Sequence, residues 1–103
     1  MRLLPVLLLL LAGCAAVAGL LDAARADVDA GKLPNAAASL ERALRIEPRN
    51  PRLWQELARV RLQQGDFAQA ESTAQRSNSW AGSDSGVRAE NARIIEQARA
   101  GRK

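Results

Sequence analysis

Three arginines recur at a constant interval: 34 positions separate Arg25 from Arg59, and 34 separate Arg59 from Arg93. A guanidinium group presents parallel N–H donors that pair with a carboxylate through two hydrogen bonds. A ladder of such groups could therefore hold the carboxylates of an acidic partner. A row of solvated arginines would give the same pattern, because arginine supplies most of the 15 basic residues. Both interpretations remain open from the sequence.

Residues suited to catalysis are scarce. The chain contains no histidine and no tyrosine. The run Gly-Ser-Asp-Ser-Gly over 82–86 has the outline of a nucleophile elbow, but its central residue is Asp84 rather than serine. Without histidine to activate a serine, a catalytic triad cannot form. We predict no enzymatic activity, and a turn in which Asp84 or Ser85 caps the following helix.

Composition also argues against other ligand classes. The net charge is +4 and the pI about 10.6, yet acidic and basic residues are intermixed and aromatic residues make up 3% of the chain. Nucleic-acid binding is therefore not expected, because base stacking requires aromatic side chains. With a single cysteine and no histidine, the sequence predicts no disulfide, no metal site and no cofactor.

The N-terminus has the features of an export signal. Arg2 precedes an apolar run over 3–11, and a short basic start followed by such a run is typical of signal peptides. The run ends in Leu-Ala-Gly-Cys over 11–14. This tetrapeptide resembles the bacterial lipobox, in which a peptidase cuts before a cysteine that carries diacylglycerol. The resemblance implies lipid attachment at Cys14, of the palmitate-bearing type.

We therefore predict a signal peptide over 1–13, with the lipobox at 11–14, and a short tether over 14–19. By resemblance to enterobacterial sorting rules, Ala15 favours the outer membrane, facing the periplasm. Three alternatives remain. Cleavage after Ala18 would release a soluble periplasmic protein. An uncleaved segment over 3–21 would anchor the chain in the inner membrane. Cys14 could also be a buried residue of a cytoplasmic protein.

The 34-residue interval extends beyond the arginines, because Gly31 and Gly65 and the residues around them align at the same offset. A period of this length is typical of stacked helix-turn-helix units. Gly31 and Gly65 can adopt the left-handed conformation that ends a helix. Asn50 before Pro51 suits an N-cap followed by proline at the first helical position. We predict a first unit over 20–50, a second over 51–84, and a capping helix and tail over 85–103.

The second unit opens with Trp54-x-x-Leu57-Ala58, and Ala36-x-x-x-Leu40 occupies the second half of the first unit. These residues resemble the tetratricopeptide repeat family, with alanine in place of the family's glycine and Arg61 in place of its tyrosine. The residues that carry the pattern are Gly31, Ala36, Leu40, Pro48, Trp54, Leu57, Ala58, Gly65, Phe67 and Ala70.

The resemblance implies protein binding. In this family the first helices of successive units line a concave face that binds extended peptides or partner helices. The candidate partner-binding residues on that face are Arg25, Arg52, Gln55, Arg59, Gln63 and Arg93. The chain lacks the lysine and asparagine set of the carboxylate-clamp members, so a C-terminal carboxylate ligand is not implied.

Trp80 lies just before the last predicted helix. We predict that it packs beneath this helix, because aromatic side chains usually serve packing. Exposure as a partner contact is the alternative.

These observations predict an all-α protein, a short tetratricopeptide-like helical solenoid of two helix-turn-helix units plus a C-terminal capping helix. The predicted function is a membrane-anchored adaptor of the bacterial cell envelope that binds a protein partner, with an acidic segment as one candidate and no small-molecule substrate. The alternative is a permanently docked structural subunit without a free groove. An accessory factor for cell-wall synthesis is a third, weaker option.

Overall fold

The computed structural model describes the backbone of residues 4–102 and the side chains of residues 13–102. Over these residues it contains helices and no strands, which confirms the predicted all-α fold class. The five helices are α1 (Leu4–Asp29), α2 (Leu33–Ile46), α3 (Pro51–Gln63), α4 (Phe67–Ala81) and α5 (Ser85–Gly101).

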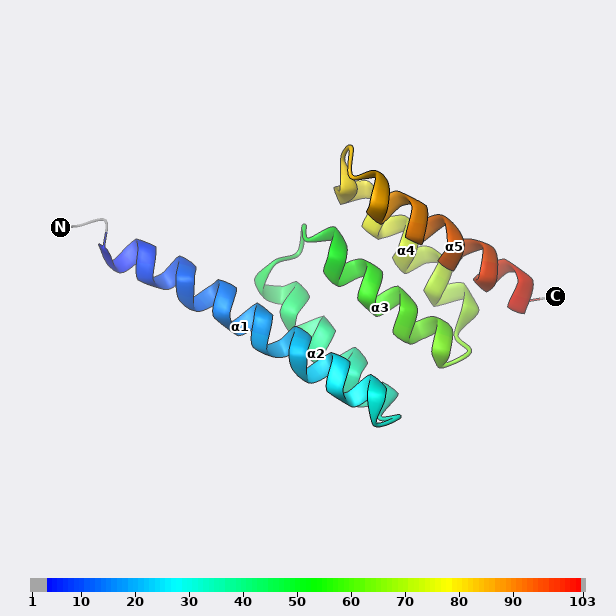
Figure 1. Cartoon of the computed structure of the whole chain (residues 1–103), viewed down its shortest axis with the longest axis horizontal. Coiled ribbons are helices and arrows are strands. Elements are labelled where there is room, and N and C mark those ends of the chain that lie inside the picture. Colours follow the sequence, from blue (N-terminus) through cyan, green and yellow to red (C-terminus); the bar gives the residue numbers. More distant parts are fainter. Residues whose placement is uncertain (1–3, 103) are drawn as a thin grey trace.

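The helices form two layers (Figure 1). Helices α1, α3 and α5 lie side by side in front, and α2 and α4 lie behind them. Helix α2 packs on α1 and α3, and α4 packs on α3 and α5. This is the arrangement of a helical solenoid, in which each element contacts its neighbours along the chain.

Two glycines end helices in the same way, one in each unit. Gly31 and Gly65 have φ of 76° and 77°. The amide of Gly65 donates to the Leu62 carbonyl (3.0 Å), and the next amide donates to the Arg61 carbonyl (3.0 Å). The same pair of bonds occurs 34 residues earlier, around Gly31. This is the Schellman motif, which favours glycine because the left-handed backbone crowds a Cβ atom. Both predicted helix ends are confirmed.

Side-chain caps begin the later helices. The Asn50 side chain accepts from the Arg52 amide (3.0 Å), and Asp66 accepts from the Gln69 amide (3.3 Å). Asp84 accepts from the Val87 amide (3.0 Å), so of the two predicted caps for the last helix Asp84 is the one used. Each bond satisfies an amide that has no partner inside its helix.

The apolar core is built mainly from small residues. Of the residues that carry the repeat pattern, Ala36, Leu40, Leu57, Ala58 and Ala70 are buried. Trp54 and Phe67 are half-buried. Trp54 packs against the cluster formed by α1, α2 and α3. Alanines at the crossings allow the helices to approach closely.

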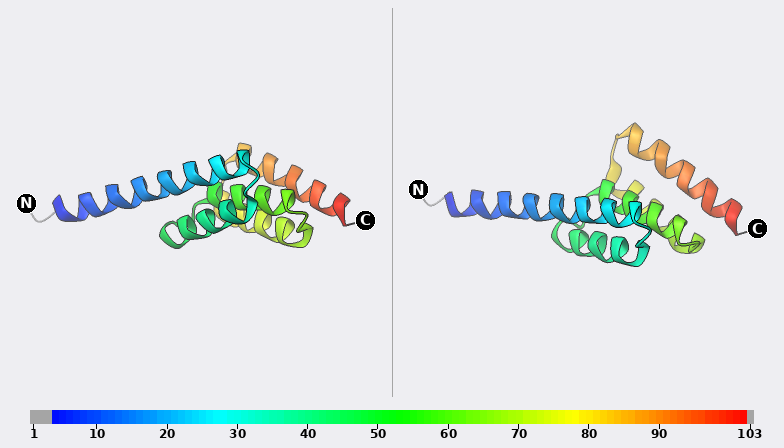
Figure 2. Two further views of the ribbon diagram at one scale, coloured as in Figure 1. Left: turned by 90° about the horizontal axis from the view of Figure 1, so that it is seen from below. Right: turned by 60° about the horizontal axis from the view of Figure 1, so that its bottom comes forward.

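Helix α1 differs from the sequence prediction. It continues through residues 14–19, where a short tether was expected, and Val17 is already buried against the core. The physical reason is that apolar residues continue in helical register across this segment. Both views in Figure 2 show the N-terminal part of α1 extending beyond the other helices.

The predicted signal peptide and the alternative membrane anchor rest largely on residues 1–12, whose side chains lie outside the described part. Within the described residues, no helix is long and apolar enough to cross a membrane.

Trp80 is exposed (41%) rather than packed under the last helix, so that prediction was wrong. It stands in the last turn of α4, and the guanidinium of Arg49 lies 5.5 Å from its ring centroid. The space between α4 and α5 near this end is filled instead by Ser77 and Asn91, both fully buried.

Candidate partner-binding site

The three arginines of the 34-residue series lie on the three front helices, one each on α1, α3 and α5. They do not stand alone, because two glutamates alternate with them. Arg25 is 3.7 Å and Arg59 3.0 Å from the carboxylate of Glu56. Arg59 and Arg93 lie 3.3 Å and 2.8 Å from the carboxylate of Glu90. We call Arg25, Glu56, Arg59, Glu90 and Arg93 the charged row.

The row crosses both junctions between front helices. Glu56 on α3 reaches back toward α1, and Glu90 on α5 reaches back toward α3. Hydrogen bonds from Arg93, together with the nearby Arg59 guanidinium, hold the pKa of Glu90 below the usual range of a glutamate. Because the side chains of Arg25 and Arg93 are 60% and 68% exposed, the two ends of the row keep donors that face solvent.

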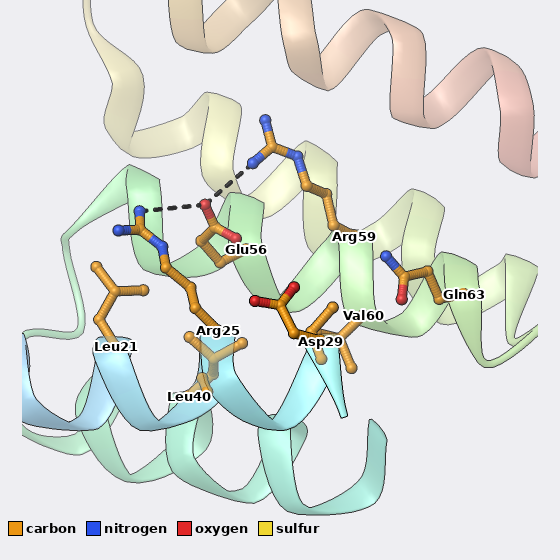
Figure 3. A pocket seen from close by; sticks show the side chains of 10 residues that line it. Leu21, Arg25, Asp29, Leu40, Glu56, Arg59, Val60 and Gln63 are labelled. Carbon is orange, nitrogen blue, oxygen red and sulfur yellow. Dashed lines mark hydrogen bonds and ion pairs between the residues drawn. The ribbon is translucent and has the colours of Figure 1, made fainter. Parts of the chain in front are cut away.

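A groove of about 130 Å³ lies between α1 and α3, next to this row. Its apolar lining is Leu21, Ala24 and Val28 from α1, Leu40 from α2 and Val60 from α3. Its polar lining is Arg25, Asp29, Glu56, Arg59 and Gln63. Figure 3 shows Arg25 and Arg59 converging on Glu56 at one side of the groove, with Asp29 and Gln63 farther along it. An apolar lining with charged groups along one edge suits an amphipathic segment.

The structure places the six predicted candidates in four different environments, the last of which is that of Gln55. Arg25, Arg59 and Gln63 line the groove. Arg93 continues the charged row beyond it, on α5. Arg52 lies at the start of α3 and faces Asp84 at 3.6 Å, away from these residues.

Gln55 has a different environment from the one expected. It is buried, and its amide donates to the Val87 carbonyl and to the Asn91 side chain, both at 2.9 Å. Asn91 in turn donates to Ser77 (2.8 Å) and Asn78 (2.9 Å). We call Gln55, Ser77 and Asn91 the polar network. It joins α3, α4 and α5 internally, so Gln55 has no free donor for a partner.

Glu56 and Glu90 were not among the residues predicted from the sequence. The signal that could have found them is the same interval that identified the arginines: Asp22, Glu56 and Glu90 are also 34 apart. Each precedes an arginine of the series by three residues, the spacing at which oppositely charged side chains pair on a helix.

Cys14 is exposed on the projecting part of α1. Its neighbour Gly13 lies close to the last turn of α2, because a Cβ at Gly13 would be 3.9 Å from the Ile46 side chain. The described residues contain no group of acidic, histidine or cysteine side chains that could hold a metal ion.

Comparisons with known proteins agree with this architecture. The family model described as tetratricopeptide repeat matches residues 27–94. Among solved structures, the chain is similar to the globular C-terminal domain of P. aeruginosa LpoP, at 45% sequence identity with a TM-score of 0.82. The match covers 84% of this chain and 81% of that one. A comparison with curated proteins gave no match.

Proposed function

Since this chain belongs to the tetratricopeptide repeat family, we propose that it is a protein-interaction adaptor anchored in the bacterial cell envelope. The observation that carries this proposal is the groove between α1 and α3, which combines apolar walls with the charged row. The partner is a protein that presents an extended or helical segment to this groove.

The charged row defines the chemistry of the segment. Arg25 and Arg93 are mostly exposed, whereas Arg59 is shared between the two glutamates. A partner carboxylate would therefore pair with the outer arginines while apolar side chains of the same segment fill the groove beside Val28 and Val60. An acidic amphipathic segment satisfies both requirements.

The anchor is the lipid at Cys14, with removal of residues 1–13 and attachment to the outer membrane on its periplasmic side. The support is the lipobox-like sequence and the exposure of Cys14. Two or three acyl chains would hold the protein firmly, whereas a single chain gives reversible membrane binding.

Intact mass of the protein from native envelopes tests the anchor. We expect a chain that starts at residue 14 with a diacylated or triacylated cysteine. Cys14→Ser should leave an uncleaved precursor in the inner membrane. A mature chain starting at Gly19, or an intact chain with an unmodified thiol, would refute lipid anchoring and favour the soluble or uncleaved alternative.

Site-specific photo-crosslinking tests the groove. A photoreactive residue at Gln63, on the groove, should capture a partner through an acidic segment that mass spectrometry can map. The matched control is Arg42, which is exposed on α2 and does not line the groove. Arg25→Gln combined with Arg93→Gln should then weaken binding of the mapped segment, with the loss shrinking at high salt. Equal capture at both positions would refute the groove as the binding site.

Purification of the protein without its partner, together with the same crosslinking experiment, distinguishes an adaptor from a permanently docked subunit. An adaptor should be soluble and monodisperse without its partner and should bind it reversibly. A subunit that aggregates when purified alone, and captures its partner equally from every face, would support permanent docking instead.

A further inference from the structure

The folded domain begins almost at the anchor itself. Only two residues separate Cys14 from Val17, which is 6% exposed and belongs to the core cluster of α1, α2 and α3. All of this segment is helical. If Cys14 carries the lipid, as the proposed function holds, the domain has no flexible tether and must lie directly at the membrane surface.

The end of the domain nearest the anchor exposes two large apolar side chains. These are Ile46 (45%) and Trp80 (41%), the exposed large hydrophobic residues of the described chain. They occupy the same repeat position, 34 residues apart, in the last turns of α2 and α4. Figure 1 shows the α2–α3 and α4–α5 connections at the end of the bundle from which α1 projects.

Two observations place Ile46 beside the anchor position and Arg49 beside Trp80. A Cβ at Gly13 would lie 3.9 Å from the Ile46 side chain, so Ile46 adjoins the residue before Cys14. Three residues farther along the chain, Arg49 places its guanidinium 5.5 Å from the centroid of the Trp80 ring. We call Arg45, Ile46, Arg49 and Trp80 the anchor-side patch.

Two arginines at this end have no carboxylate partner among the described residues, and one of them, Arg49, lies over the Trp80 ring. Arg88 donates to the carbonyls of Gly82 (2.7 Å) and Asn78 (3.4 Å), and Arg52 faces Asp84. Arg45 and Arg49 are both exposed at the end of α2 and in the loop that follows.

We propose that the anchor-side patch docks on an anionic phospholipid surface and fixes the orientation of the domain on its membrane. Trp80 and Ile46 enter the headgroup region, where amphipathic aromatic rings are favoured. Arg45 and Arg49 pair with lipid phosphates, and basic residues close to an anionic surface add to binding. The partner groove then stays at a fixed height above the bilayer, so the bound segment must come from a protein close to that membrane.

Fluorescence quenching by brominated lipids tests this docking on the full mature protein, with acylation of Cys14 first verified by mass. The protein is reconstituted into vesicles of brominated phosphatidylcholine with or without phosphatidylglycerol. Trp54→Phe leaves Trp80 as the single tryptophan, and Trp80→Phe leaves the half-buried Trp54 as the internal reference. We expect strong quenching of Trp80 in the anionic vesicles and weak quenching of Trp54.

Charge reversals then identify the docking residues. Arg45→Glu with Arg49→Glu should lower the ratio of docked to undocked protein by about 30-fold or more, because each basic residue near an anionic surface contributes about 1 kcal/mol to binding. The charge-matched control is Lys32→Glu with Arg102→Glu, at the opposite end of the bundle, which should leave quenching unchanged.

Two results would contradict the docking proposal while leaving lipid attachment at Cys14 intact. One is unquenched Trp80 on protein whose Cys14 is acylated. The other is equal loss of quenching in the control and in the patch variant. A photoreactive residue at position 80 that captures a protein in native envelopes, with no quenching in pure lipid, would assign the patch to a protein contact. An unmodified Cys14 would instead contradict the lipid anchor of the proposed function, whatever the result of the docking experiment.

Discussion

The two junctions between front helices occupy the same repeat positions but are held differently. Between α1 and α3, Leu21 packs against the apolar cluster that contains Leu53 and Leu57, and the groove lies beside Leu21. Thirty-four residues later, where α3 meets α5, the corresponding residues are Gln55, Val87 and Asn91, which are joined by hydrogen bonds of 2.9 Å. We call these the apolar junction and the polar junction.

The difference shows how the same repeat backbone can form either a junction held by hydrogen bonds or one that leaves a groove. Hydrogen bonds are directional, so the polar junction fixes α5 at one distance and angle from α3. Apolar contacts are non-directional, so the apolar junction can be lined with leucine and valine and still leave space. The polar junction joins α5 to α3 by hydrogen bonds, and the apolar junction leaves the groove to which we assign the partner.

Breaking the polar network should have the largest effect. Asn91→Ala should lower the free energy of unfolding by about 3 kcal/mol, because it removes the bonds that Asn91 makes to the buried side chains of Gln55 and Ser77 and opens a cavity. Gln55 keeps its bond to the Val87 carbonyl, and Ser77 keeps its bond to the Pro51 carbonyl. Chemical denaturation followed by circular dichroism measures this change.

Converting the polar junction into the apolar one is the matched test. Gln55→Leu, Ser77→Ala and Asn91→Leu together install the residues found 34 positions earlier at Leu21, Ala43 and Leu57. Because the three network side chains lose their polar groups together, and the half-buried Asn78 oxygen that loses its donor can bond to water, the stability should return to within about 1 kcal/mol of the natural chain. If the triple variant is as unstable as Asn91→Ala, the network has a role in packing that leucine cannot replace.

Much of the fold could be predicted from the sequence because it depends on local interactions at a fixed interval. Gly31 and Gly65 end their helices, and Asn50, Asp66 and Asp84 begin theirs, through bonds within a few residues. Such signals can be found in a single sequence.

The polar network could not be predicted in this way. Gln55 and Asn91 have side chains that are usually exposed, and only the approach of α5 to α3 makes them partners. The prediction that Trp80 packs beneath the last helix was wrong for the same reason, because Asn91 and Ser77 fill the space between α4 and α5. The arginine row was found, but its interleaved glutamates were missed although they follow the same interval. The role of the row in binding stays a prediction.

A second, smaller difference concerns the two loops that connect α2 to α3 and α4 to α5. The Trp54 indole donates to the Pro48 carbonyl (2.8 Å), and the Arg88 guanidinium donates to the Gly82 carbonyl (2.7 Å), so both make the same bond one repeat apart. Trp54 also packs on the core, whereas Arg88 is exposed. Trp54→Ala should therefore cost about 2 kcal/mol, and Arg88→Ala about 1 kcal/mol or less.

Thermal melts of these variants measure the difference, with Trp80→Ala as the control. Because Trp80 is an exposed side chain of the same type, its removal should change stability by no more than about 0.5 kcal/mol. Equal losses for Trp54→Ala and Arg88→Ala would mean that the shared hydrogen bond, rather than burial of the indole, stabilises the loop.

The smallest expected effect concerns Glu90, which crosses the polar junction to Arg59. Its pKa is lowered in the folded protein, chiefly by hydrogen bonds from Arg93. A carboxyl group with a lowered pKa stabilises the fold above its unfolded pKa, about 4.3, and this stabilisation is lost as the pH falls through the folded pKa. Glu90→Gln should therefore cost about 0.5 kcal/mol at pH 7, as for a partly exposed ion pair, and almost nothing at pH 2. Urea denaturation at both pH values measures the change, and Glu96→Gln on the exposed side of α5 is the control. A cost that persists at pH 2 would show that Glu90 acts through packing, and that the charged row does not tie α5 to α3 electrostatically.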